Sequence, residues 1–190
     1  FALRLIRTGR QRLQKLTDDL LQLSEIESAR PEADAPPVLL GEIAEKVAAS
    51  LRPEAQARGI VLHQFMGDVK VKADPRRIYQ LLKNLMENAV KYNREGGAVN
   101  LSATLERGVA VIRVHDTGIG IPAEHLDRVF ERFYRVDKGR SREQGGTGLG
   151  LSIVKHIVGL YGGDVRADSA PGVGTTFTVR LPASVEENGG

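Results

Sequence analysis

The chain has 190 residues, of which 41% are hydrophobic, enough to bury the core of one domain with a small appendage. Its net charge of +3 comes from 27 basic and 24 acidic residues spread along the sequence, which is no signature of nucleic-acid binding. The absence of cysteine excludes disulfides, thiolate-bound zinc and thiol catalysis, and no apolar run approaches the roughly 20 residues of a membrane-spanning helix.

The sequence starts at Phe1, and its first residues lack the apolar segment of a signal peptide. We therefore expect a soluble fragment, with any sensor or membrane segment upstream of it. A cysteine-free chain suits a reducing cytoplasm without proving that location.

An N-terminal helix is predicted by apolar residues at coiled-coil spacing. These residues are Ile6, Leu13, Leu16, Leu20 and Leu23. Spacing alone leaves two interpretations open, a dimerising coiled coil or an amphipathic helix packed on its own domain.

A domain boundary is expected after this helix. Residues 31–37 (PEADAPP) are too rich in proline to continue a helix and are interpreted as a linker. The main domain would then occupy residues 38–183, and residues 184–190 would form a disordered tail.

The main domain is predicted to combine helices with strands. Apolar spacing predicts a helix over residues 41–57, and Asp74-Pro75 is a strong start for a helix over 75–93, because aspartate caps free N–H groups and proline suits the first turn. A further helix is expected over 151–161, and strands over 60–65, 69–73, 99–105, 109–115, 164–168 and 175–181. The fold class is α+β, a two-layer sandwich of a mixed, mostly antiparallel sheet covered by helices, preceded by the coiled-coil-like helix.

Two asparagines on the helix over 75–93 form a candidate metal site. Asn84 and Asn88 are four residues apart and share a helix face beside the apolar stripe that should pack on the sheet. Amide oxygens suit Mg²⁺ when a triphosphate supplies the negative charge, and Lys91 follows on the same side. A pair of solvated or capping amides is the alternative. Glu87 is expected to point away from the stripe into solvent.

A buried carboxylate is predicted at the end of the strand over 109–115. Alternate residues of this strand face the core, and Asp116 continues the alternation. A buried carboxylate needs a partner, which the exocyclic amine of adenine would provide. Gly118 and Gly120 lack a Cβ and would let a flat ring approach the backbone. An Asp-Thr-Gly turn that caps a helix is the alternative.

A glycine-rich segment precedes the helix over 151–161. Its residues are Gly146, Thr147, Gly148, Leu149 and Gly150. Free N–H groups before a helix can hold phosphates, although the segment fits neither the P-loop pattern nor a Rossmann fingerprint.

The residues between the two glycine segments are polar, basic and interrupted by glycine. This composition over 130–142 predicts a mobile lid, with Arg135 and Arg140 as candidate contacts to a γ-phosphate. A solvated basic loop is the alternative.

In this order the motifs resemble those of the ATP-binding catalytic domain of sensor histidine kinases. Residues 84–92 resemble the asparagine box, 116–122 the first glycine box and 130–137 the F box. Residues 146–154 (GTGLGLSIV) match the second glycine box without a departure, and residues 1–30 resemble the second dimerisation helix.

The resemblance implies a Bergerat fold that binds ATP and Mg²⁺. It assigns magnesium to Asn88 with help from Asn84, the phosphates and the ribose or base to Lys91 and Tyr92, and adenine to Asp116. The implied ATP-binding residues are Asn84, Asn88, Lys91, Tyr92, Asp116, Gly118, Gly120, Gly146, Thr147, Gly148, Leu149 and Gly150, and the implied catalytic residues are Asn84, Lys91, Arg135 and Arg140.

No phosphoacceptor histidine is found in this chain, since none of its four histidines lies in the His-Glu/Asp-x-Arg-x-Pro type of sequence that this family uses. The acceptor helix should precede Phe1, so the chain should bind nucleotide without phosphorylating itself. The resemblance implies transfer of the γ-phosphoryl group to that histidine and then to the receiver domain of a response regulator, within a homodimer formed through residues 1–30. It implies no nucleic-acid partner and a membrane link only through upstream segments.

Two other functions remain open. A hydrolytic ATPase of the gyrase and MutL group, on the same fold, would need a glutamate base where this chain has Asn84. A non-catalytic dimerisation module would bind ATP weakly or not at all.

Overall fold

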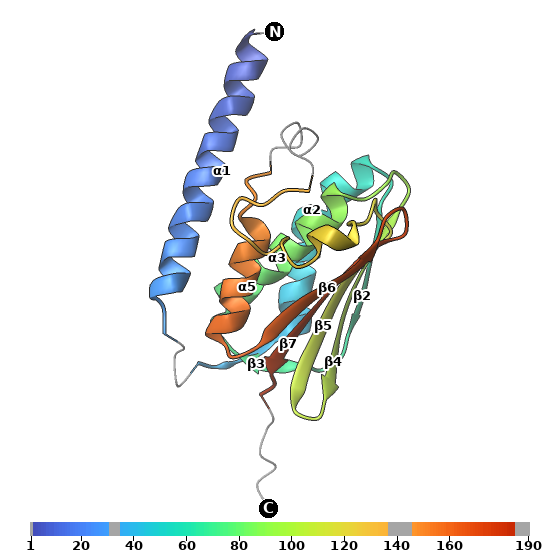
Figure 1. Cartoon of the computed structure of the whole chain (residues 1–190). Helices are drawn as coiled ribbons and strands as arrows, with labels where there is room; N and C mark the ends of the chain where they lie inside the picture. The colour runs from blue at the N-terminus through green and yellow to red at the C-terminus, as the bar shows by residue number, and fades with distance from the viewer. Residues whose placement is uncertain (1, 31–34, 137–145, 185–190) are drawn as a thin grey trace, which may run out of the picture.

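The computed structural model describes residues 2–30, 35–136 and 146–184. A five-stranded sheet forms one layer, and three helices cover one of its faces (Figure 1). The strand order is β2-β4-β5-β7-β6, in which only the pairing of β2 with β4 is parallel. The predicted α+β sandwich with a mixed, mostly antiparallel sheet is therefore confirmed.

The strands of this sheet lie close to their predicted positions. Their bounds are Val61–Met66 for β2, Ala98–Glu106 for β4, Val109–Asp116 for β5, Asp164–Ala170 for β6 and Gly174–Pro182 for β7. In β5 the side chains of Ala110, Ile112, Val114 and Asp116 are all buried, as the alternation predicted. Asp116 pairs with Thr175 of β7, which brings the ends of two strands together at the edge of the core.

A small second sheet was not predicted. Strand β1 (Pro37–Leu39) pairs antiparallel with β3 (Lys70–Lys72). Pro37, which the sequence placed at the end of a linker, therefore belongs to a strand. A three-residue strand is too short to show a period, and its proline argued for a loop.

The covering helices are α2 (Leu40–Ala57), α3 (Pro75–Lys91) and α5 (Gly150–Leu160). Helix α3 begins as predicted: Asp74 accepts a hydrogen bond from the backbone N–H of Arg76 (2.8 Å), and Pro75 occupies the first turn. Its apolar stripe, with Leu81 and Leu85 fully buried, lies in the core between helices and sheet. On the polar side of α3, Glu87, Asn88 and Lys91 are only partly buried.

Helix α1 (Ala2–Ser28) runs beside α5 and extends past the rest of the domain (Figure 1). Leu23 and Ile26 are buried against the domain core, and Leu16 packs partly against it. Leu13 and Leu20 of the predicted seam are 67% and 43% exposed. One side of the C-terminal half of α1 thus packs on its own domain, while Leu13 and Leu20 of the seam face solvent. None of the helices in the described part of the chain has the length and apolarity needed to cross a membrane.

Candidate functional site

A single pocket brings together residues from the three predicted motifs. It lies between the polar side of α3, the ends of β5 and β7, and the segment before α5. Asn88 and Asp116, which the sequence assigned to the metal and the base, line this same pocket. The other predicted residues along its wall are Asn84, Lys91, Tyr92, Gly120, Arg135, Gly146, Thr147, Gly148 and Gly150.

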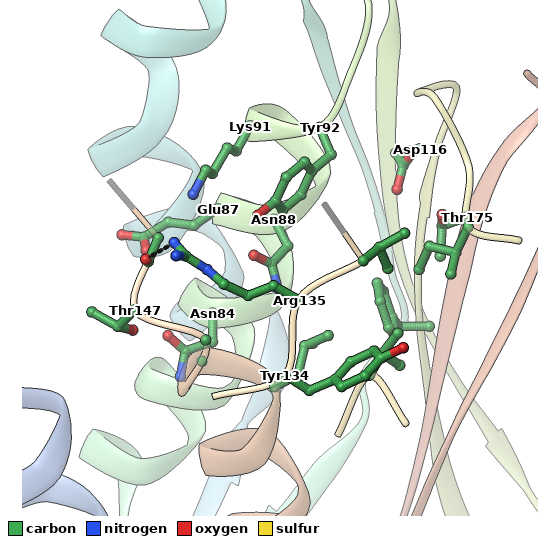
Figure 2. Close-up of a pocket in the computed structure, with 18 of the residues that line it drawn as sticks. Asn84, Glu87, Asn88, Lys91, Tyr92, Asp116, Tyr134, Arg135, Thr147 and Thr175 are labelled. Atoms are coloured by element: carbon green, nitrogen blue, oxygen red, sulfur yellow. Dashed lines mark hydrogen bonds between the residues drawn. The ribbon is translucent and has the colours of Figure 1, made fainter. Parts of the chain in front are cut away.

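The pocket has two chemically different ends (Figure 2). Asp116 and Thr175 lie at the strand end of the view, and Lys91 and Thr147 lie at the opposite end. Arg135 extends between them. At the end opposite Asp116, the cations Lys15, Lys91 and Arg135 accompany the carboxylates Glu87 and Asp19. The excess of cations there suits the negatively charged tail of a ligand whose polar base lies near Asp116.

The asparagines of α3 present oxygen donors to the pocket. Asn84 is 8% exposed, and among the described residues no hydrogen-bond partner exists for its Nδ2 atom. A Cβ at Gly150 would lie 3.6 Å from Asn84 Oδ1, so the start of α5 is close to this amide. An unpaired N–H donor at the pocket wall would be satisfied by an acceptor on a ligand, such as a phosphate oxygen, whereas a metal would bind the Oδ1 atom of the amide. The two neutral amides fit Mg²⁺, which takes oxygen ligands together with waters and phosphates.

Lys91 supplies a cation at the end of α3. Burial lowers its pKa, and the neighbouring cations Lys15 and Arg135 act in the same direction, whereas Tyr92 opposes them. Its Nζ lies 5.1 Å from the centre of the Tyr92 ring. A desolvated amino group gains from an anionic partner, so Lys91 is well placed to contact a phosphate.

The end of α3 is fixed by Arg58, which caps the C-terminus of α2. Its guanidinium donates hydrogen bonds to the backbone carbonyls of Val90, Lys91 (3.1 Å) and Asn93 (2.7 Å). Carbonyls at a helix C-terminus have no partner within the helix, and a cation there interacts favourably with the helix dipole. Arg58 therefore holds the turn that carries Lys91.

Asp116 is 4% exposed at the end of β5. Desolvation raises the pKa of its carboxyl group, although backbone hydrogen bonds from Gly118 and Thr175 partly offset this effect. A buried, desolvated carboxylate is suited to accept a hydrogen bond from the amine of adenine.

The two glycines after Asp116 allow a close approach between protein segments. A Cβ at Gly118 would lie 2.3 Å from the carbonyl oxygen of Tyr92, and one at Gly120 would lie 2.0 Å from that of Ala170. Gly120 also has a positive φ of 71°. Gly120 lines the pocket and Gly118 does not. Glycine is therefore required at position 118 because the end of α3 lies so close, and not to make space for an adenine ring.

The second glycine segment leads directly into α5, whose first residue is Gly150. Leu149 is fully buried in the core, so any contact that it makes with a nucleotide would come from its backbone. The carbonyl of Gly148 accepts a hydrogen bond from the N–H of Phe133 (2.9 Å), which joins the segment to the chain before it. The start of an 11-residue helix at a pocket edge favours anion binding.

Of the two lid arginines, Arg135 lies within the part of the chain that the structure describes. Arg135 donates a hydrogen bond to the carbonyl of Gly146 and lines the pocket. Arg140 lies outside the described residues. Phe130 packs edge-on against Phe177, with ring centres 6.1 Å apart, whereas Phe133 is 56% exposed.

Glu87 was expected to point away from the apolar stripe into solvent, but its side chain is only 28% exposed. It lines the pocket, and its carboxylate lies 3.4 Å from the Nζ of Lys15 and 3.7 Å from that of Lys83. A helical wheel places residue 87 about 60° from Asn84 and 40° from Lys91, so its position could have been predicted. The expected solvation was wrong because the polar face of α3 that lines the pocket includes residue 87 as well as the two asparagines.

Other pocket residues gave no local signal. Lys15 and Asp19 reach the pocket from α1, and Thr175 reaches it from β7. Their positions depend on how distant segments pack. Asp19 is 8% exposed and accepts a hydrogen bond from the hydroxyl of Thr147 (2.5 Å).

Comparisons with known proteins agree on one family. The sequence profile described as histidine kinase-, DNA gyrase B-, and HSP90-like ATPase matches residues 73–185. Sensor histidine kinases YkoH and WalK of Bacillus subtilis (strain 168) are 41% and 38% identical to the chain, covering 94% and 93% of it. The structure of full-length ShkA in complex with AMPPNP covers 97% of the chain with a TM-score of 0.82 and 29% identity. The chain spans 38%, 30% and 39% of these three proteins, respectively.

Proposed function

We propose that the pocket of this chain, which belongs to the family of histidine kinase-, DNA gyrase B- and HSP90-like ATPases, transfers the γ-phosphoryl group of Mg-ATP to a histidine on another segment. Within that family the chain is the ATP-binding catalytic domain of a sensor histidine kinase. The observation that carries this proposal is the shared pocket of Asn88, Asp116 and the glycine segment before α5. An acid for the base, amides for a metal and a helix start for phosphates occur there together.

The protein residues would act mainly by binding and orienting the nucleotide. Asp116 would accept a hydrogen bond from the adenine amine, and the N–H groups of residues 146–150 would hold phosphate oxygens. Lys91 and Arg135 would offset the negative charge that remains. Mg²⁺, held by Asn88 and assisted by Asn84, would neutralise part of the triphosphate charge.

The transfer itself would be an in-line displacement. A bond forms between an imidazole nitrogen of the acceptor histidine and the γ-phosphorus, and the bond to the bridging oxygen breaks, so that ADP leaves. Alignment and charge stabilisation supply most of such catalysis. The phosphohistidine would then pass its phosphoryl group to an aspartate of a response-regulator receiver domain.

Dimerisation through residues 1–30 is part of the proposal. The exposed Leu13 and Leu20 on α1 support it, because a second helix would cover them. We place the domain in the cytoplasm, where ATP and the receiver domain would both be available.

One observation favours a second candidate function, ATP hydrolysis. Glu87 lies in the pocket and could in principle activate a water molecule. Its carboxylate, however, pairs with the amino groups of Lys15 and Lys83, so it is less available to bind and deprotonate a water molecule. We therefore favour the kinase.

Labelled ATP separates the candidates. The chain would be incubated with ATP labelled at the γ-phosphate, with and without an added helix that carries an acceptor histidine. The kinase predicts label on histidine only when that helix is present, and little free phosphate without it. Release of free phosphate in both mixtures would support hydrolysis, and no magnesium-dependent ATP binding by titration would exclude both activities.

A further inference from the structure

We propose that helix α1 contributes a phosphate-binding residue, Lys15, to the nucleotide pocket. This inference rests on the proposed function, because it adds a residue to the same ATP site. It means that the site is built by both the N-terminal helix and the α+β domain.

Lys15 lies where the charged end of a nucleotide is expected. It lines the pocket, and its Nζ is 3.4 Å from Oε2 of Glu87, one helical turn before Lys91 on α3. The side chain of Lys15 is 51% exposed, so its amino group can exchange one anionic partner for another at modest cost. The pair thus keeps the Lys15 amino group at this end of the pocket.

The charges around this end fit a polyanion. Lys15 and Arg135 both lie close enough to Lys91 to lower the pKa of its amino group. Glu87 is near Lys15 and Lys83, and Asp19 also interacts with Lys15, so two carboxylates face the four cations Lys15, Lys83, Lys91 and Arg135. A ligand with several negative charges would relieve the repulsion among them.

Contacts along α1 fix the register that presents Lys15. Asp19, one turn later, is buried and accepts the Thr147 hydroxyl at 2.5 Å. Leu23 and Ile26 are buried in the domain core. Near the end of the helix Glu27 pairs with Arg132 and lies 3.3 Å from the Nε2 of His156.

Asp19 is the opposing charge on the same face of α1. Its carboxylate is turned to Thr147 and largely shielded from solvent, so we assign it an anchoring role. The competing interpretation of Lys15 is a surface ion pair with Glu87 that contributes little to binding or stability. The two interpretations differ in one respect: only a phosphate contact depends on the number of phosphates.

The test is a calorimetric titration with adenosine, ADP and ATP in the presence of Mg²⁺. The variants are Lys15→Ala, Lys15→Arg and, as a matched control, Lys46→Ala, which removes an exposed lysine of α2 outside the pocket. We expect Lys15→Ala to raise the Kd for ATP about three- to tenfold, with a smaller rise for ADP and none for adenosine. Lys15→Arg should retain ATP affinity within about twofold, because the charge remains, and Lys46→Ala should bind like the parent chain.

The possible results distinguish a failure of the Lys15 proposal from a failure of the proposed function. If the parent chain binds Mg-ATP and Lys15→Ala binds it equally well, the role of Lys15 is refuted while the proposed function stands. An equal loss for adenosine and ATP would also refute it, since that result indicates a structural effect of α1. If the parent chain binds no ATP, the proposed function itself fails.

Discussion

Oδ1 of Asp116 accepts a hydrogen bond from the backbone N–H of Gly118 at 2.8 Å. The turn after β5 thereby fixes the orientation of a buried carboxyl group at the base end of the pocket. Because Thr175 also donates a backbone hydrogen bond to this group, its position is set by two strands.

Asp116→Asn should weaken ATP binding about tenfold or more and reduce the preference for ATP over GTP. An amide has one acceptor oxygen, so it cannot satisfy both the Gly118 N–H and an adenine amine in the same way as a carboxylate. Titration with both nucleotides measures the effect, and Asp168→Asn, at an exposed position on β6, is the control. Unchanged ATP affinity in Asp116→Asn would show that the carboxylate does not read the base.

The same substitution should change the stability of the nucleotide-free chain in a pH-dependent way. Burial raises the pKa of Asp116 above its usual value of 3.8, so folding favours the protonated form. Its contribution to stability is full below the unfolded pKa and is lost as pH rises through the folded pKa. Asp116→Asn should therefore be more stable than the parent chain at pH 7, by a margin that shrinks as the pH falls. Urea denaturation between about pH 4 and 8 measures this difference.

Asn88→Ala should remove most of the magnesium dependence of ATP binding. The change deletes an oxygen donor at the pocket wall and leaves the base end intact. We expect the Kd for ATP with Mg²⁺ to rise about tenfold or more, and the Kd without Mg²⁺ to change little. A variant that keeps the full response to Mg²⁺ would show that the metal is bound elsewhere.

Gly120→Ala should destabilise the fold by about 2–4 kcal/mol, because a Cβ there meets a carbonyl oxygen while the backbone has a positive φ. The added Cβ would lie 2.0 Å from the carbonyl oxygen of Ala170. Gly108→Ala is the matched control: Gly108 also has a positive φ, 81°, but no atom lies within 4 Å of its added Cβ. We expect a loss of about 1–2 kcal/mol at Gly108 from backbone strain alone. Equal losses in thermal or urea unfolding would contradict the role of the close contact.

Much of the fold could be predicted because its elements have strong local signals. The start of α3 at Pro75 follows from an aspartate cap and a proline, and the burial of Asp116 follows from the alternation along β5. Strand β1 was missed, since three residues that begin with Pro37 carry too little pattern. Its existence depends on pairing with β3, some 30 residues later.

The candidate site was predictable only where a motif is continuous in sequence. Asn84, Asn88 and Lys91 belong to one helix face, so their proximity follows from helix geometry. Thr175 and Lys15 come from elements far away in the chain, and no spacing rule connects them to α3. Glu87 is a different case. Helix geometry places it on the same polar face as Asn84 and Lys91, but the prediction took only the two asparagines and Lys91 as that face.

Arg58 holds the last turn of α3 by hydrogen bonds, and this turn is connected to both the proposed base contact and the proposed metal contact of the pocket. Tyr92, whose carbonyl accepts the N–H of Ile119 at 3.1 Å, ties this turn to the loop after Asp116, while Asn88 stands one turn earlier on the same rigid helix. Arg58 does not line the pocket, and we expect a substitution there to alter both the proposed base contact and the proposed metal contact together.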